Sequence, residues 1–233
     1  RSPNGKVADI TFGIAYFAYY GKKDLYANAD GILRVWVPST DGKSLPINIT
    51  MENGEEFVFC VTVGGDGTVT QVDFLAVNGT IVTSSESTSG DVWSYRSDTK
   101  VLTLTGDAQL DGISTNGAFH VLVPEGGAKN VILHRLTLTA MYMKSGSALT
   151  NVSAIVIQND VAMTVSRSNT VTAVSKYAAG IEVAKDASLV LASAANGKLV
   201  VRGGDYTAGI GSNGLNKNGN IGMPGLIAIE SGE

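Results

Sequence analysis

Short hydrophobic runs separated by small polar clusters fill the chain, and no sustained apolar pattern at helical spacing occurs. The first half contains three dipeptides, Asp41-Gly42, Asn53-Gly54 and Asp66-Gly67, that supply the positive φ of tight hairpin turns. We therefore expect an all-β chain whose first half is antiparallel. The strands expected there span residues 7–12, 15–19, 33–37, 47–51, 56–63 and 68–75.

The strand expected at 56–63 is apolar on both of its alternating faces, which predicts a central strand covered on both sides. It holds the single cysteine, Cys60, which we interpret as a small core residue because free cysteines are usually buried. The two histidines that could activate a thiol, His120 and His134, both lie in the other half of the chain. Cys60 is therefore a poor candidate for a nucleophile.

The second half of the chain carries three segments that can be laid over one another. Their alignment places Ile155, Ile181 and Ile210 in one column, and Thr172 opposite Val200. Each segment consists of short strands separated by Gly, Asn, Asp or Ser. A repeat of roughly 20–30 residues built in this way is typical of a solenoid, in which each unit buries its apolar row only by stacking on the next. We expect a parallel β-helix here.

The pattern divides the chain into an antiparallel β domain at 1–80, a linker at 81–90 and the β-helix at 91–233. The linker is expected because this stretch is short, polar and rich in Ser and Thr. The last repeat stops before its third strand, so we expect the β-helix to be incomplete at its C-terminal end. A neighbouring chain or a missing segment would then cover the strand edges left open.

Composition and charge narrow the functional classes. Hydrophobic residues make up 44% of the chain and charged residues 16%, which supports a sizeable core. The net charge of −4 argues against a nucleic-acid partner, which would select a basic face. No apolar run reaches the ~20 residues of a membrane-spanning helix. Because the first residue is Arg1, we expect a trimmed chain whose targeting segment is gone, and an extracytoplasmic location.

Two family resemblances follow from particular stretches. The stretch 93–106 and the Ala-Gly-Ile motifs at 179–181 and 208–210 resemble bacterial surface β-helix proteins of the "carbohydrate-binding domain-containing" kind, over about 90–233. This resemblance implies a right-handed parallel β-helix, a pectin-lyase-like solenoid, and carbohydrate binding. The stretch 45–80 is similar to the closing strands of fimbrillin-like domains, which implies a surface adhesin or pilus module of Gram-negative gut bacteria.

Parallel β-helix enzymes mostly act on polysaccharides, so the chain has to be searched for their chemistry. A lyase needs a base beside carboxylates that bind calcium, and a hydrolase needs two or three converging carboxylates. No acidic residues in 91–233 stand in Asp-x-Asp or Asp-Asp spacing, and Glu182 has Gly211 as its counterpart one repeat on. His120 and His134 have no cysteine or carboxylate pair near them in sequence. We expect no catalytic set, no metal and no cofactor.

The aromatic residues indicate a binding site more than a reaction. Lys176-Tyr177 and Asp205-Tyr206 each precede an Ala-Gly-Ile motif, which places Tyr177 and Tyr206 on successive repeats. The two rings form either a buried packing ladder or an exposed platform for sugar rings. Lys176 and Asp205 would flank that platform and hydrogen-bond sugar hydroxyls. Strand alternation puts both on the opposite face unless the backbone turns; Gly203-Gly204 predicts a turn before Asp205, and nothing similar precedes Lys176.

The leading functional hypothesis is a non-enzymatic bacterial surface adhesin or glycan-binding module, with a glycan or another host surface ligand as its partner. We expect the ligand to be a neutral glycan, because the chain has no basic cluster to bind an acidic one. Two alternatives stay open: a polysaccharide-active lyase or hydrolase, and a structural stalk or assembly subunit without a ligand of its own.

Overall fold

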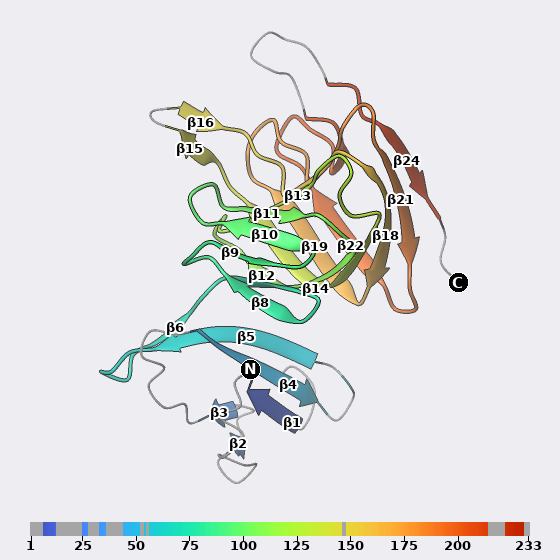
Figure 1. The fold of residues 1–233 in the computed structure, drawn as a ribbon. Coiled ribbons are helices and arrows are strands. Elements are labelled where there is room, and N and C mark those ends of the chain that lie inside the picture. The colour runs from blue at the N-terminus through green and yellow to red at the C-terminus, as the bar shows by residue number, and fades with distance from the viewer. Residues whose placement is uncertain are drawn as a thin grey trace. The chain divides into compact units, whose positions relative to one another are not determined.

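The chain is all-β. The computed structural model describes residues 7–12, 25–27, 33–35, 44–51, 54, 56–145, 148–213 and 222–230, and every regular element in these ranges is a strand (Figure 1). The chain divides into two compact units, Arg1–Val72 and Asp73–Glu233. Within the ranges given above, no helix is long and apolar enough to cross a membrane. The expectation of an all-β chain is confirmed.

The first unit contains an antiparallel sheet with the strand order β1-β4-β5-β6 and a separate pair, β2-β3. Expected and observed bounds agree for β1 and β5, whereas the expected strand at 15–19 lies outside the described residues. The strand expected at 68–75 is split, because the chain leaves this unit after Val72. The strands are β1 (Val7–Phe12), β2 (Leu25–Ala27), β3 (Leu33–Val35), β4 (Leu45–Met51), β5 (Glu56–Val63) and β6 (Val69–Gln71).

Strand β5 lies inside its sheet, between β4 and β6. Cys60 on this strand is fully buried beside other core residues such as Leu45 and Val63. Burial raises the pKa of its thiol to about 11, and a hydrogen bond with the Ser44 side chain opposes the shift in part. A thiol with this pKa stays protonated and unreactive near neutral pH. The interpretation of Cys60 as a core residue therefore fits its surroundings.

The boundary between the units differs from the expected one. The expected linker at 81–90 contains β9 and most of β8, both of which are hydrogen-bonded into sheets of the second unit. Strand β8 forms a hairpin with β7 through Asn78-Gly79, where both residues have positive φ as a two-residue hairpin turn requires. The polar composition that suggested a linker belongs to sheet-edge strands, whose side chains are largely solvated.

The second unit is built from two long sheets whose strands alternate along the chain. One has the order β23-β20-β17-β13-β11-β10-β9 and the other β24-β21-β18-β14-β12-β7-β8, in which β19 also pairs with β14 and β22 pairs with β19. Pairing is antiparallel near β7–β11 and parallel from there on. The strands to β14 are β7 (Phe74–Val77), β8 (Thr80–Thr83), β9 (Thr88–Gly90), β10 (Trp93–Arg96), β11 (Val101–Leu104), β12 (Ala108–Ser114), β13 (His120–Val123) and β14 (Asn130–Ala140).

The later strands repeat a three-part arrangement in which a strand of one sheet is followed by two of the other. Figure 1 shows β18, β21 and β24 side by side, as their parallel registers require. A small antiparallel pair, β15-β16, interrupts the series. These strands are β15 (Met143–Ser145), β16 (Ala148–Thr150), β17 (Ile155–Ile157), β18 (Asp160–Ser166), β19 (Ser168–Ala173), β20 (Ile181–Val183), β21 (Ser188–Ser193), β22 (Lys198–Arg202), β23 (Ile210–Gly211) and β24 (Leu226–Ile229).

The predicted isoleucine column is confirmed. Ile155 pairs with Ile181, and Ile181 pairs with Ile210. The first two side chains are fully buried and the third is partly buried. The expected pairing of Thr172 with Val200 is wrong, because Val200 pairs with Thr170. The error is two residues, so it leaves each side chain on its expected face, because side chains alternate with a period of two along a strand.

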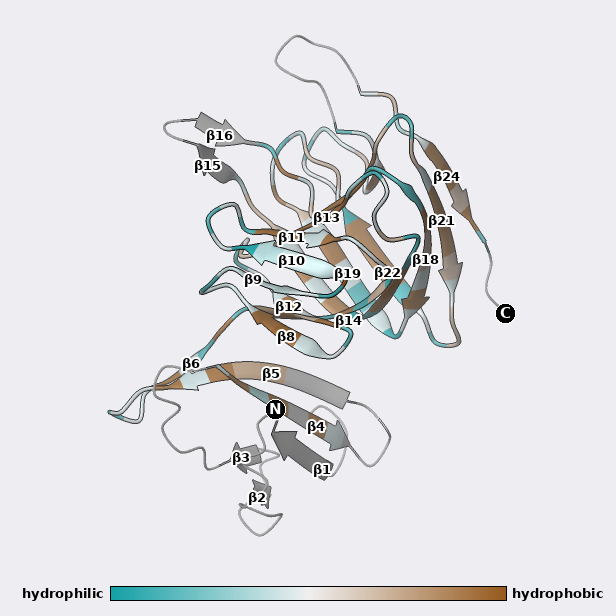
Figure 2. Cartoon of the chain, in the orientation of Figure 1, coloured by the Kyte–Doolittle hydropathy of each residue, from teal (hydrophilic) through white to brown (hydrophobic). Residues whose placement is uncertain are grey.

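Burial follows this alternation on many strands of the second unit, such as β11, β12, β17 and β20. Strand β12 alternates between buried and half-buried side chains over its whole length. Figure 2 shows hydrophobic residues on strands such as β8 and β24 and hydrophilic ones in many of the turns. The ring of Tyr95 is the largest fully buried side chain; its hydroxyl donates to the Ala118 carbonyl at 3.0 Å and its centroid lies 4.8 Å from that of Phe119. The core therefore accepts polar groups where a partner satisfies them.

Candidate functional site

The four residues proposed from the sequence lie in two turns. Lys176 and Tyr177 are in the turn that leads from β19 into β20, and Asp205 and Tyr206 are in the turn from β22 into β23. The turn expected before Asp205 is therefore present. A turn is also present at Lys176, because the Ala178 N–H donates to the Ser175 carbonyl. The extended backbone that would have pointed the Lys176 side chain away from Tyr177 is therefore absent at this position.

Backbone hydrogen bonds hold the two turns against each other. The Tyr206 N–H donates to the Lys176 carbonyl at 3.1 Å, and the Gly204 N–H donates to the Ala178 carbonyl at 3.0 Å. The Thr207 hydroxyl donates to the same Ala178 carbonyl at 2.7 Å. The approach at Gly204 is so close that a Cβ there would overlap the Ser175 carbonyl oxygen. The position of each tyrosine is thus fixed by the backbone.

The two rings form the expected ladder. The centroids of Tyr177 and Tyr206 are 5.6 Å apart and the ring planes are inclined by 30°. This spacing falls in the range of favourable aromatic pairs. The Tyr206 side chain is 60% exposed and Tyr177 is half-buried. The ladder is therefore partly open to solvent, which is the condition that a sugar platform has to meet.

The Lys176 side chain lies over the same rings. Its Nζ is 4.8 Å from the Tyr206 centroid and 5.5 Å from the Tyr177 centroid, within the ~6 Å range of cation–π contacts. Lys176 is exposed and forms no ion pair with any residue that the structure describes. Asp205, also exposed, forms no side-chain hydrogen bond or ion pair in the same part of the chain. The Lys176 ammonium thus lies over the two rings without a carboxylate partner among the described residues, and Asp205 shares the turn that carries Tyr206.

Sequence reasoning missed a third tyrosine. The Tyr142 hydroxyl accepts a hydrogen bond of 3.1 Å from the Lys176 N–H, and this side chain is 41% exposed. The pairing of Ala140 with Ala173 brings the segment that holds Tyr142 next to the turn that holds Lys176. The Ala-Gly-Ile motif that marked the other two tyrosines is missing after Tyr142, so the alignment did not reach it. We call Tyr142, Lys176, Tyr177 and Tyr206 the tyrosine platform.

The most buried acidic residues of this unit serve local hydrogen bonding. Glu182 accepts from the Ser153 hydroxyl at 2.9 Å and from the Asn213 amide at 2.7 Å, and its neighbour on β23 is Gly211. Asp111 lies 3.1 Å from His134 Nδ1 and 2.8 Å from the guanidinium of Arg135. No group of three His, Cys, Asp or Glu side chains among the described residues is placed to hold a metal ion.

His120 lies in the core. Its side chain is 3% exposed and its Nδ1 is 3.3 Å from the Ser153 carbonyl oxygen. Burial lowers the pKa of this imidazole, and the nearby positive charge of Lys100 lowers it further. The ring is therefore neutral in the folded chain at neutral pH. This environment fits a structural histidine better than a metal ligand.

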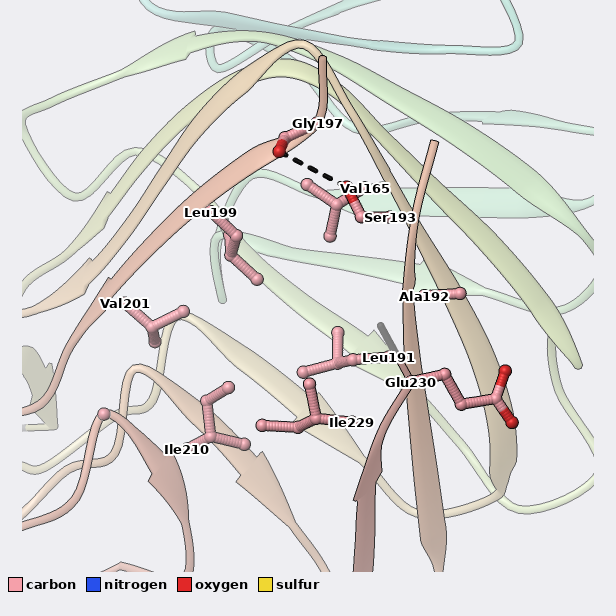
Figure 3. A pocket seen from close by; sticks show the side chains of 11 residues that line it. Val165, Leu191, Ala192, Ser193, Gly197, Leu199, Val201, Ile210, Ile229 and Glu230 are labelled. Atoms are coloured by element: carbon pink, nitrogen blue, oxygen red, sulfur yellow. Dashed lines mark hydrogen bonds between the residues drawn. The ribbon is translucent and has the colours of Figure 1, made fainter. Parts of the chain in front are cut away.

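An apolar pocket of about 400 Å³ lies where β21, β22 and β24 meet (Figure 3). Leu191, Leu199, Val201, Ile210 and Ile229 line it, and Figure 3 shows the Glu230 carboxylate directed away from them. The lining side chains are mostly aliphatic, with Ser193 and Glu230 among them, which suits an apolar segment better than a sugar. We still predict that a neighbouring chain or a further segment covers the strand edges at this end of the unit.

Comparison with protein-family models, with curated proteins and with solved structures finds no match to the chain. Its function therefore has to be argued from side-chain chemistry. The strongest local arrangement is the tyrosine platform, since it combines exposed aromatic faces, an available ammonium group and a backbone fixed by hydrogen bonds.

Proposed function

We propose that this chain is a non-enzymatic glycan-binding module of an extracytoplasmic bacterial surface protein, an adhesin in the broad sense. Within the tyrosine platform, we propose Tyr177 and Tyr206 as the rings on which the sugar stacks. The observation that carries the proposal is the pair of rings, Tyr206 exposed and Tyr177 half-buried, on adjacent turns that are hydrogen-bonded to each other. No equally organised group of exposed side chains occurs among the other described residues.

Sugar rings suit such a platform for electrostatic and geometric reasons. The face of an aromatic ring is electron-rich, and the C–H bonds on one face of a pyranose are polarised toward positive hydrogen. Tyrosine also offers a large contact area at a low cost in side-chain entropy. The turns that carry Tyr177 and Tyr206 are tied together by backbone hydrogen bonds, so little further ordering is needed on binding.

The architecture that presents the platform is proposed to be a right-handed parallel β-helix. Three series of parallel pairings support it: β11-β13-β17-β20-β23, β12-β14-β18-β21-β24 and β14-β19-β22. The right-handed sense is the one that connections between parallel strands almost always take. In this arrangement successive turns stack at the strand spacing of ~4.8 Å, which brings equivalent side chains such as Tyr177 and Tyr206 together.

The proposal predicts a large loss of glycan binding in the double variant Tyr177→Ala/Tyr206→Ala. Each ring is worth roughly 0.5–1.5 kcal/mol, so affinity for any hit from a glycan array should fall on the order of 5–150-fold. Calorimetric titration measures this loss. The melting temperature should change little, because substitutions of exposed side chains are usually worth within ~0.5 kcal/mol.

The matched control is Met223→Ala, which truncates an exposed apolar side chain on another segment and should leave affinity unchanged. Undiminished binding in the double variant would remove the platform from consideration and shift attention to the Asn-rich stretch 212–220, most of which lies outside the described residues. Release of new reducing ends from a bound glycan would contradict the non-enzymatic assignment and favour a lyase or hydrolase.

A further inference from the structure

We infer that the platform selects acidic glycans, in which a sugar stacked on the tyrosines presents a carboxylate to the Lys176 ammonium. This inference rests on the proposed glycan-binding function and names its ligand class. It departs from the expectation of neutral glycans drawn from the chain's composition. The absence of a basic cluster in the sequence is outweighed by the placement of one lysine.

The first support is that the Lys176 ammonium has no carboxylate partner among the described residues. Two arginines of the second unit are paired with carboxylates: Arg96 lies 2.7 Å from Asp98, and Arg135 lies 2.8 Å from Asp111. Lys176 forms no ion pair with the residues that the structure describes, and its Nζ rests over two aromatic faces instead. A carboxylate approaching this ammonium from solvent would meet an available charge-assisted donor.

The second support is the fixed backbone of Lys176. Its N–H donates to the Tyr142 hydroxyl, and its carbonyl accepts from the Tyr206 N–H. Residues on both neighbouring turns thus anchor the backbone of Lys176, and the cation–π contacts place its ammonium over the rings. An anchor fixed in this way loses less freedom on binding than a lysine on a mobile loop.

The third support is geometric. When one face of a pyranose stacks on an aromatic ring, an equatorial carboxylate of a uronic acid projects sideways from the ring edge. The Lys176 Nζ lies over the Tyr206 ring, 4.8 Å from its centroid, so a sugar that stacks on this face would displace the lysine side chain to the ring edge, where the carboxylate projects. The stacking contact and the ion pair can therefore form together.

The negative charge around the site limits how densely charged a bound glycan can be. Asp205 is exposed in the turn that carries Tyr206, and the whole chain has a net charge of −4. A densely charged polyanion would be repelled by these charges. A glycan with acidic sugars separated by neutral ones would place one carboxylate at Lys176 and avoid the repulsion.

The test compares an oligosaccharide of alternating hexuronic acid and neutral sugar with its carboxyl-reduced, neutral counterpart. Wild-type chain should bind the acidic ligand at least ~10-fold more tightly in 20 mM salt, and the preference should shrink in 1 M salt, where the screening length falls to ~3 Å. Lys176→Met should abolish the preference while keeping residual binding to both ligands. Lys176→Arg should retain the preference, because the positive charge is kept.

Lys185→Met is the matched control, since it removes the same charge from an exposed lysine in another turn and should leave the preference intact. Equal binding of the two ligands by the wild type would overturn the inference while leaving the platform itself standing. Failure of both ligands, and of every other glycan, would count against the proposed function. Stronger binding of a sulfated oligosaccharide than of the carboxylated one would overturn the assignment to carboxylates.

Discussion

Leu189→Ala should lower the free energy of unfolding of the second unit by about 2–5 kcal/mol, the usual range for truncating a buried leucine. Leu189 is fully buried on β21, paired with buried Val161 on one side and with Ile227 on the other. The loss combines the removed apolar contacts with the cavity that the neighbouring strands cannot fill. Denaturant unfolding monitored by circular dichroism measures it.

The control is the next residue along the strand. Val190 is half-buried and points to the opposite face from Leu189, so Val190→Ala should cost no more than about 1 kcal/mol. Similar small losses in both variants would show that β21 does not pack as its burial pattern indicates. A larger loss for Val190→Ala would reverse the assignment of the two faces.

Gly204→Ala should destabilise the second unit by about 1–3 kcal/mol, the range for steric overpacking. A Cβ at this position would overlap the Ser175 carbonyl oxygen on the adjacent turn, and both groups belong to backbone that cannot rotate away. The turn that carries Tyr206 would have to move outward. We therefore expect the variant to weaken glycan binding in addition to its lower melting temperature.

Gly65→Ala provides the comparison, because nothing lies within 4 Å of the Cβ that it would add. This substitution should be neutral or slightly stabilising, as alanine reduces the freedom of the unfolded chain. If the second unit melted alike with and without Gly204→Ala, the close stacking of the turns at Lys176 and Tyr206 would be disproved.

Much of the fold could be predicted from the sequence where alternation of side chains is strong. The bounds of β1 and β5 and the column of Ile155, Ile181 and Ile210 follow from apolar residues that repeat in step with the pleat. The expected linker at 81–90 failed because its strands lie at sheet edges. Such strands carry polar side chains, and composition alone does not distinguish them from loops.

The candidate site could be predicted in part. Tyr177 and Tyr206 were found because each precedes an Ala-Gly-Ile motif. The side chain of Lys176 was expected on the opposite face, since no glycine marks the turn that redirects it. Tyr142 could not be aligned without its motif, because its link to Lys176 is a hydrogen bond across 34 positions of sequence. Contacts of this kind depend on the stacking register, which the sequence specifies only indirectly.

The most direct test of the account is to locate the bound sugar on the tyrosines themselves. Intermolecular nuclear Overhauser effects between sugar C–H protons and selectively labelled tyrosine rings report contacts within about 5 Å, the range of ring-stacking distances. The account predicts such contacts from Tyr177 and Tyr206, lost in the double alanine variant. Contacts confined to other residues, or a bound glycan that leaves both rings unperturbed, would contradict it.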